Sequence, residues 1–403
     1  MFRTLPLALA LAAALAAPAL AAPSADPSAR PTPKVAPAEA PWAFQAPKPS
    51  VKAKFGAVAS VSEVASRIGV ETLKKGGNAI DAAIAVAFAL AVVYPEAGNI
   101  GGGGFMTVRL ANGETVCLDY REKAPGKASR DMYLDAEGNL TDKSLIGSLA
   151  AGVPGTVAGL EAAHKRYGKL PWASLVAPAI ALAEQGFVVN DYLAGSMRRS
   201  YDLLVRFPET RRVLLPGGSA PKAGSVLKQA DLGKTLRRIQ KEGAKGFYHG
   251  PVAQAIAKDQ AATGGIITTA DLAAYRPAWR APVSFTYRGH KVISMPPPSS
   301  GGVTLAQILN ILEGYDLKAA GWHSPQHIHW MIEAERRAYA DRNAYLGDPD
   351  FIKDQPIETL SSKAYAAKRR QTILPDKATP AFGLTPGLGE SEDTTHFSVV
   401  DRF

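Results

Sequence analysis

A run of nine residues near the end of the chain, from Asp393 to Asp401, contains the side chains whose chemistry can be stated most concretely. Its second residue is Thr394, followed by Thr395 and His396. A threonine hydroxyl is a poor nucleophile and needs a base to remove its proton. When threonine is the first residue of a chain, its own α-amine, with a pKa of about 8, can be that base. Taken alone, however, the run is explained most simply as the start of a β-strand.

A second candidate is Arg121, in the sequence DYREKAP that starts at Asp119. The planar guanidinium group of arginine can bind a carboxylate through two parallel hydrogen bonds, which a lysine ammonium group cannot reproduce. The simpler explanation is a surface arginine that forms an ion pair with Glu122 or Asp119. The residues by themselves leave both interpretations open.

The glycine-rich run from Gly98 to Gly104 invites comparison with nucleotide-binding loops. A dinucleotide fingerprint places its glycines between a strand and a helix, whereas here a predicted helix precedes the run and a predicted strand follows it. The Gly-Lys-Ser or Gly-Lys-Thr ending of a phosphate-binding loop is also missing from this run. We therefore predict a tight, close-packed turn beside a site.

Histidines and serines provide two weaker candidates. His323, His327 and His329 are close in sequence, but no Cys, Asp or Glu nearby completes a metal-binding set, so capping or surface roles are expected. Ser299 and Ser300 follow three prolines and lack the Gly-x-Ser-x-Gly pattern of a nucleophile elbow. They are interpreted as the capping region of a helix that follows a rigid proline segment. No metal or organic cofactor is expected.

Composition limits the function classes further. The chain has 403 residues, of which 46% are hydrophobic, so it can bury a sizeable core. Its formal net charge is +10, but Lys and Arg are scattered, and no nucleic-acid partner is expected. Cys117 is the only cysteine, which excludes an internal disulfide.

Residues 1–22 have the pattern of a secretory signal peptide, with Arg3 at the start, a short apolar stretch, and a predicted cleavage after Ala21 or Ala22. The stretch is short for a bilayer span, so no membrane span is expected. Residues 23–50 are rich in Pro and Ala and are predicted to be an extended linker. An exported protein, periplasmic or secreted, is therefore expected.

The rest of the chain mixes helices and strands. Ser62 is expected to cap a helix that ends near Gly76. The next helix, from Ala79 to about Val93, is apolar on nearly all sides and should be buried. Strand pairs are expected at 105–120, with a turn at Asn112-Gly113, and at 282–295. Further helices are expected at 157–167, 172–185, 252–262, 303–312 and 325–344, the last with ordinary ion pairs between Glu and Arg.

Several segments together resemble the γ-glutamyltranspeptidase family, in family order, from about Ala53 to Phe403. They are GGNAIDAAIA, PEAGNIGGGGFM, DYREKAP, GVPGTVAGL, MPPPSSGG, AYADRNAYLGDPDF and DTTHFSVVD. The resemblance implies an α+β fold, the αββα sandwich of N-terminal-nucleophile hydrolases. It also implies a large subunit at 51–393 and, at 394–403, the start of a small subunit of which most is missing here.

The resemblance also implies roles for individual residues. The chain would cut itself between Asp393 and Thr394, and the new N-terminal Thr394 would be the catalytic nucleophile. Arg121 would bind the α-carboxylate of the glutamyl group. The implied substrates are glutathione and γ-glutamyl peptides, with water, amino acids or dipeptides as acceptors, and the implied partner is the small subunit from the same precursor.

Two alternatives to this function are compatible with the same sequence. A glutaryl or cephalosporin acylase can use the same scaffold, because substrate choice depends largely on small-subunit residues. A truncated, non-catalytic remnant is the other alternative, since the implied oxyanion hole also belongs to the small subunit. Missing strands would leave sheet edges and apolar surface uncovered, so a chain ending at Phe403 is expected to be unstable or prone to aggregation by itself.

Overall fold

The computed structural model describes residues 52–380 and 397–400. The expected signal peptide, the expected linker, and the residues Asp393 and Thr394 all lie outside these ranges. The chain divides after Lys52, and its helices and strands belong to the compact unit Ala53–Phe403.

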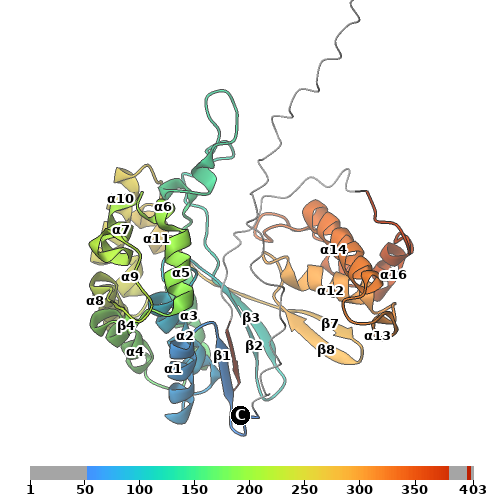
Figure 1. Ribbon diagram of the computed structural model, residues 1–403, viewed down its shortest axis with the longest axis horizontal. Coiled ribbons are helices and arrows are strands. Elements are labelled where there is room, and N and C mark those ends of the chain that lie inside the picture. Colours follow the sequence, from blue (N-terminus) through green and yellow to red (C-terminus); the bar gives the residue numbers. More distant parts are fainter. Residues whose placement is uncertain (1–51, 381–396, 401–403) are drawn as a thin grey trace, which may run out of the picture. The chain divides into compact units, whose positions relative to one another are not determined.

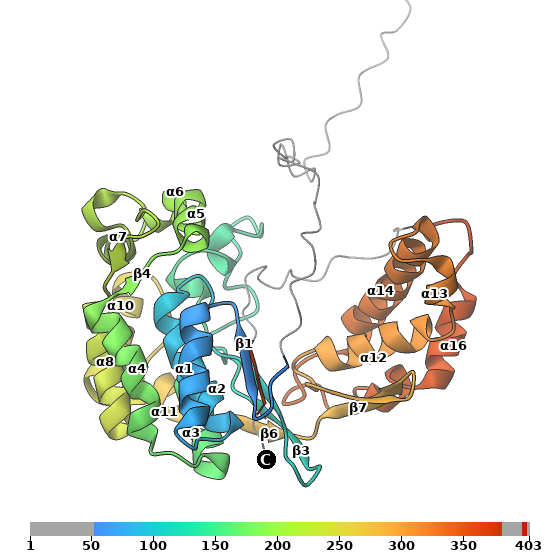
Figure 2. The ribbon, with the colours of Figure 1, turned by 60° about the horizontal axis from the view of Figure 1, so that its bottom comes forward.

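Two consecutive helices at the start of this unit confirm their sequence predictions. Helix α1 (Glu63–Lys74) begins after Ser62, whose side chain accepts a hydrogen bond from the Ala65 amide at 3.4 Å. Helix α2 (Ala79–Val93) is buried along nearly its whole length and packs against α1, as Figure 2 shows. Reciprocal hydrogen bonds between Asn78 and Asp81 cap its first turn at 3.0 Å each. This apolar helix is the centre of the main hydrophobic core.

The strands that bear on the site form two small antiparallel sheets. Strands β2 (Phe105–Arg109) and β3 (Thr115–Asp119) form the predicted hairpin, and β6 (Ala278–Arg280) pairs with the other edge of β3. Strand β1 (Ala57–Ser60) pairs with β9 (Phe397–Val400), with Ser60 opposite Phe397. Within the described ranges, β1 and β2 each have one edge without a neighbouring strand.

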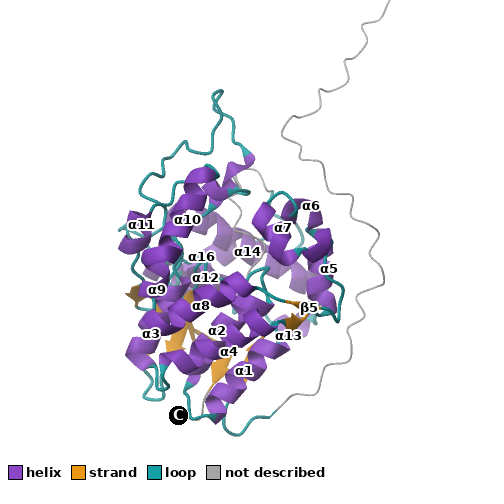
Figure 3. Cartoon of the chain, turned by 90° about the vertical axis from the view of Figure 1, so that its left-hand side faces the viewer, coloured by secondary structure: helices purple, strands orange, loops and turns teal. Residues whose placement is uncertain are grey.

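Helices cover these strands on one side and share their core with α2. Figure 3 shows this helical layer with the strands behind it. Its members are α3 (Thr156–Tyr167), α4 (Trp172–Gln185), α5 (Asp191–Arg199), α6 (Tyr201–Leu204), α7 (Pro208–Leu214), α8 (Ala230–Glu242), α9 (Lys245–Tyr248), α10 (Gly250–Ala262) and α11 (Thr269–Ala274). A short pair, β4 (Phe187–Val188) with β5 (Val226–Leu227), and three 3₁₀ turns, η1 (Asp142–Ser144), η2 (Ser148–Ala150) and η3 (Pro216–Gly218), complete it.

A second group of elements follows β6 along the chain and has hydrophobic clusters of its own. The hairpin of β7 (Val283–Tyr287) and β8 (His290–Ser294) packs against α12 (Gly301–Leu312). Helix α12 lies beside α14 (Pro325–Tyr345) and α16 (Lys363–Gln371), as Figure 1 shows. The short helices α13 (Leu317–Ala320) and α15 (Ile357–Leu360) connect these longer helices.

Most long elements match their predictions, and the differences have simple causes. Helices α10 and α12 begin two residues before the predicted starts, at Gly250 and Gly301, because the prediction began at the first apolar residue. Helix α8, which has 13 residues, was not predicted, and the short helices α5 to α7 were missed because so few turns show no clear period. The α+β class is confirmed. No helix in the described ranges is long and apolar enough to cross a membrane.

The ion pairs predicted for α14 are present, but their surroundings were not predicted. Glu333 pairs with Arg337 inside the fold, where both residues are buried. The helix packs on α12 with one face, and the loop after α16 covers Glu333 and Arg337. Sequence periodicity did not reveal this covering because it comes from residues about forty positions later in the chain.

Candidate active site

Arg121 lies just beyond the end of β3, and its backbone is held on three sides. Its amide donates to the Asp119 carboxylate at 3.0 Å, and its carbonyl accepts from the Tyr275 hydroxyl at 2.8 Å. On the third side, a Cβ atom added to Gly103 would lie only 2.8 Å from the Arg121 Cα. The side chain itself is exposed. A rigid backbone therefore presents a solvent-accessible guanidinium group.

The glycine-rich run makes this close packing possible. The Gly102 carbonyl accepts hydrogen bonds from the Gly155 and Thr156 amides at 2.7 and 3.0 Å. A Cβ on Gly155 would come within 2.0 Å of the Tyr120 carbonyl oxygen, and one on Gly103 within 2.5 Å of the same atom. Larger residues would push these segments apart. The predicted tight, close-packed turn is confirmed.

Asp119 pairs with a different arginine from the one considered in the sequence. Its buried carboxylate accepts a hydrogen bond from the Nε atom of Arg280 at 2.9 Å, and the Arg280 Nη2 atom lies 2.8 Å from the same carboxylate oxygen. Arg280 also lies 3.7 Å from Asp350. Among the described residues, no carboxylate forms an ion pair with Arg121, so the expected alternative of a pair with Asp119 or Glu122 is wrong. The Asp119–Arg280 pair instead fixes the strand end that precedes Arg121.

Tyr275 can hold the Arg121 carbonyl over the whole physiological pH range. Burial, together with the nearby Tyr248, raises the pKa of the Tyr275 hydroxyl far above its ordinary value. The Tyr275 and Tyr248 rings stack with their centroids 5.8 Å apart and their planes at an angle of 9°. Burial likewise raises the pKa of Tyr120 to about 12. The phenols of Tyr275 and Tyr120 therefore stay neutral, and the Tyr275 hydroxyl remains a hydrogen-bond donor.

The Arg121 side chain borders a cavity of about 260 Å³. Three segments that are far apart in sequence converge on it, and its wall carries both cationic and anionic groups. The lining residues are Arg121, Glu122, Pro297, Pro298, Ser300, Arg342, Leu346, Gly347 and Asp348. Such a site can receive a small zwitterion, whose carboxylate and ammonium groups need partners of opposite charge.

Arg342 is a functional candidate that the sequence did not reveal, and Ser300, which the sequence assigned to helix capping, lines the same cavity. The Arg342 Nε atom donates to the Ser300 hydroxyl at 3.2 Å, which ties the last turn of α14 to the start of α12. Both residues are in segments that carry the family resemblance, MPPPSSGG and AYADRNAYLGDPDF, and this was the only available signal. That these segments meet Arg121 depends on packing between α12 and α14. The residue that caps α12 is a serine, as predicted, namely Ser300, but its side chain makes no capping hydrogen bond; the Ser299 hydroxyl accepts from the Gly301 amide at 3.2 Å.

The predicted nucleophile and scissile bond, at Thr394 and Asp393, lie outside the described residues. The described residues closest to them in sequence are those of β9, which begins at Phe397 and pairs with β1 along its whole length. The strand predicted from this run is confirmed from Phe397 to Val400.

The clustered histidines bind backbone groups. The buried His327 accepts a hydrogen bond at Nδ1 from the His323 amide at 3.2 Å, and the His329 Nε2 atom lies 2.7 Å from the Leu374 carbonyl. These roles resemble capping, although the burial of His327 was not expected. In the described ranges, no group of three or more His, Cys, Asp or Glu side chains could hold a metal ion.

Comparison with known proteins places the chain among characterised sequences. The profile of the family described as gamma-glutamyltranspeptidase matches residues 65–403. The glutathione hydrolase proenzyme of Escherichia coli (strain K12) is 49% identical over 357 residues, which are 87% of this chain and 61% of that protein. The acylase ACY 1 proenzyme of Pseudomonas sp. (strain V22) is 43% identical over 86% of this chain and 63% of its own length.

Among solved structures, the γ-glutamyltranspeptidase of Helicobacter pylori superposes with a TM-score of 0.81 at 48% identity. The match covers 86% of this chain and 100% of that one. By contrast, this chain spans a little under two thirds of the length of the curated Escherichia coli and Pseudomonas relatives described above.

Proposed function

This chain belongs to the γ-glutamyltranspeptidase family, and on that premise we propose that it is part of an enzyme that hydrolyses or transfers the γ-glutamyl group of glutathione and related γ-glutamyl compounds. The observation that carries the proposal is the exposed Arg121 guanidinium group, held on a rigid backbone at the wall of a cavity and paired with no carboxylate in the described ranges. Such a group is ready to bind the carboxylate of a substrate.

Arg121 would bind the α-carboxylate of the glutamyl group through two parallel, charge-assisted hydrogen bonds. Because its amide and carbonyl are both held, the backbone needs no further ordering when the substrate binds, and the remaining cost is the ordering of the Arg121 side chain. This arrangement favours tight, oriented binding of the glutamyl end, which leaves the γ-carbonyl as the reacting group.

Thr394 would supply the nucleophile in two successive reactions. In the precursor, its hydroxyl attacks the Asp393 carbonyl carbon, the peptide C–N bond breaks, and an ester forms while the Thr394 nitrogen becomes a free amine. Water then hydrolyses the ester, which separates Asp393 from Thr394. The new α-amine can accept the proton of the Thr394 hydroxyl in catalysis.

In turnover, the Thr394 oxygen attacks the γ-glutamyl carbonyl, and the amine, such as Cys-Gly, departs with a proton. The resulting ester is resolved by water, which completes hydrolysis, or by the amino group of an amino acid or dipeptide, which completes transfer. The two pieces made by self-cleavage, one ending at Asp393 and one beginning at Thr394, remain together as partner subunits. No cofactor takes part in this scheme.

We also propose that the protein is exported, periplasmic or secreted, after cleavage behind Ala21 or Ala22. The support is the sequence pattern of these residues. An N-terminus at Ala22 or Pro23 in the protein recovered from the exported fraction is the expected result, and an intact Met1 would contradict it.

Intact masses of the protein from its own exported fraction test the proposed self-cleavage. We expect a piece that ends at Asp393 and another that begins at Thr394, together with hydrolysis of a chromogenic γ-glutamyl anilide. Thr394→Ala should abolish both, whereas Thr395→Ala, the neighbouring residue of the same type, should retain both. An uncut chain without activity in the unmodified protein would reject the proposal.

An acylase that removes glutaryl groups is a second candidate, favoured by the 43% identity to the acylase ACY 1 proenzyme. A glutaryl group has a carboxylate in the place of the glutamyl α-carboxylate but lacks the α-amino group. Parallel assays on a γ-glutamyl anilide and a glutaryl amide decide between the two. A larger kcat/KM for the γ-glutamyl anilide is expected, and a larger value for the glutaryl amide would select the acylase.

A further inference from the structure

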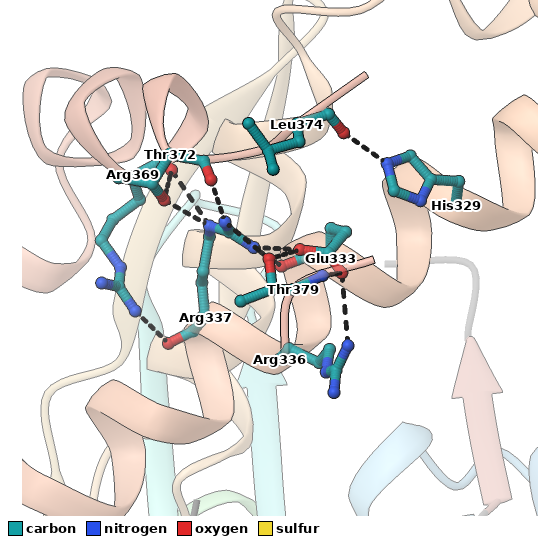
Figure 4. Close-up of polar contacts among 8 residues, drawn as sticks. All are labelled: His329, Glu333, Arg336, Arg337, Arg369, Thr372, Leu374 and Thr379. Atoms are coloured by element: carbon teal, nitrogen blue, oxygen red, sulfur yellow. Dashed lines mark hydrogen bonds and ion pairs between the residues drawn. The ribbon is translucent and has the colours of Figure 1, made fainter. Parts of the chain in front are cut away.

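Glu333, in the middle of α14, has a fully buried carboxylate that is surrounded by donors (Figure 4). The Arg337 Nη1 atom donates to it at 2.5 Å, and the Thr379 amide donates at 3.0 Å. The Thr379 hydroxyl donates to the carboxylate oxygen Oε2. Arg336 contributes a longer contact at 3.4 Å. A charge this deeply buried requires such partners, and Thr379 supplies two of the donors, its amide and its hydroxyl.

The ionisation of this carboxylate agrees with its surroundings. Burial alone would raise the pKa of Glu333, but the hydrogen bonds from Thr379 and Arg337 outweigh burial and lower the pKa to about 2. The carboxylate is therefore charged, and able to accept all of these hydrogen bonds, at every pH at which the protein would work.

The chain that leads to Thr379 lies along α14 and is held there at several points. The Arg337 guanidinium donates to the Thr372 carbonyl at 2.5 Å and to the Thr372 hydroxyl at 2.7 Å. Further along, His329 lies 2.7 Å from the Leu374 carbonyl oxygen (Figure 4). The end of α16, the connecting loop and Thr379 are thus attached in turn to one helix.

The position of Thr379 in the sequence gives these contacts their importance. Thr379 precedes the stretch that contains Asp393 and Thr394, and Phe397, just beyond that stretch, is held on β1 by the strand pairing. If Thr379 is released, the next firmly held point upstream is Leu374, whose carbonyl oxygen lies beside His329, so the connection to Phe397 becomes about five residues longer. A longer connection samples more conformations, so a bond within it spends less of its time in a reactive geometry.

We propose that Glu333 is a positioning residue for self-cleavage, which anchors Thr379 and thereby fixes the upstream end of the stretch that carries the scissile bond. This inference rests on the proposed cleavage between Asp393 and Thr394. It assigns no contact of Glu333 with substrate, because neither Glu333 nor Thr379 lines the Arg121 cavity.

Three variants separate anchoring from general stability. Thr379→Val removes the hydroxyl that binds Glu333 and keeps the shape of the side chain. Thr372→Val is the matched control, because it removes a hydroxyl that binds Arg337 in the same network but does not touch Glu333. Thr379→Ser restores the hydroxyl and tests for rescue. All three are small changes, unlike Glu333→Gln, which leaves the Arg337 charge without its partner.

The first readout does not require self-cleavage. Lys377 is exposed and lies two residues before Thr379, so opening of this segment should speed trypsin cleavage of the Lys377–Ala378 bond. In a Thr394→Ala background, we expect Thr379→Val to speed this cut roughly tenfold relative to Thr372→Val. Equal cutting rates in the two variants would overturn the anchor.

The second readout is the rate at which the Thr394-containing precursor converts to two pieces. Thr379→Val should slow conversion by up to about twofold, Thr379→Ser should restore it, and protein that has been cleaved should keep its kcat and KM. Faster trypsin cutting with unchanged conversion would overturn the positioning role. An unmodified protein that never converts would reject the proposed function, whereas the trypsin result would still decide whether Glu333 anchors Thr379.

Discussion

Two Glu–Arg pairs in this protein have the same spacing and the same length but lie in different surroundings. Glu63 and Arg67 on α1 are four residues apart and 2.5 Å apart, with side chains 81% and 72% exposed. Glu333 and Arg337 on α14 are also four residues and 2.5 Å apart, with side chains 1% and 6% exposed. An exposed pair is screened by water and contributes little, whereas a buried pair leaves an uncompensated charge if one partner is lost.

Arg121 is a third kind of arginine. It is exposed, as Arg67 is, but no carboxylate in the described ranges pairs with it. Its backbone, not its side chain, is held by hydrogen bonds. Burial should therefore make Arg337 a stability residue, and an accessible guanidinium should make Arg121 a binding residue.

Removal of the buried arginine should produce the largest effect. Arg337→Ala is expected to lower the free energy of unfolding by about 3–5 kcal/mol, because Glu333 would remain buried without its partner. Arg67→Ala, the matched exposed change, should lower it by less than about 1 kcal/mol. Urea unfolding of both variants measures the difference, and similar losses would show that burial does not distinguish the two pairs.

The pH dependence of the same pair should be the next largest effect. The folded pKa of Glu333, about 2, lies below its ordinary value of 4.5, so its contribution is complete above pH 4.5 and is lost as the pH falls toward 2. The lowering corresponds to roughly 3 kcal/mol. Glu333→Gln should therefore lose about this much at pH 7 and progressively less between pH 4.5 and 2 in urea titrations.

Glu63→Gln is the control for this pH series, because its carboxylate is exposed and its spacing to arginine is the same. Its stability should differ little from that of the unmodified protein at each pH. A gap between Glu333→Gln and the unmodified protein that stays constant down to pH 2 would show that the charge of Glu333 is not the source of its effect.

Arg121→Ala should change binding more than stability. We expect KM for a γ-glutamyl anilide to rise roughly a hundredfold, with self-cleavage intact and the free energy of unfolding nearly unchanged. Arg121→Lys should recover only part of the loss, since an ammonium group cannot form the two parallel bonds. If Arg121→Ala instead blocks cleavage of the precursor, the role of Arg121 is structural.

The smallest effect is expected from the hydroxyl that holds the Arg121 backbone. Tyr275→Phe removes the donor to the Arg121 carbonyl and should cost about 1 kcal/mol of stability, with a KM increase of roughly fivefold. Tyr248→Phe is the matched control, because Tyr248 stacks on Tyr275 but donates to the Pro154 carbonyl at 2.8 Å. Equal KM values for the two variants would show that the backbone of Arg121 needs no such support.

The sequence by itself determined the elements with strong local signals. The cap at Ser62, the buried helix from Ala79 to Val93 and the hairpin turn at Gly113 all depend on neighbours within a few residues, so pattern alone predicted them. The ordered motifs from Ala53 onward also determined the family, and Arg121 and Thr394 were named as site residues from that resemblance.

Only the tertiary structure decided which charged groups meet. Asp119 pairs with Arg280 and not with Arg121, Ser300 and Arg342 join the cavity wall, and Glu333 is covered by Thr379. Local sequence cannot distinguish the Glu63–Arg67 pair from the Glu333–Arg337 pair, because the spacing is identical and the burial comes from distant segments. Burial sets the energy of a charge, and burial is a property of the packed fold.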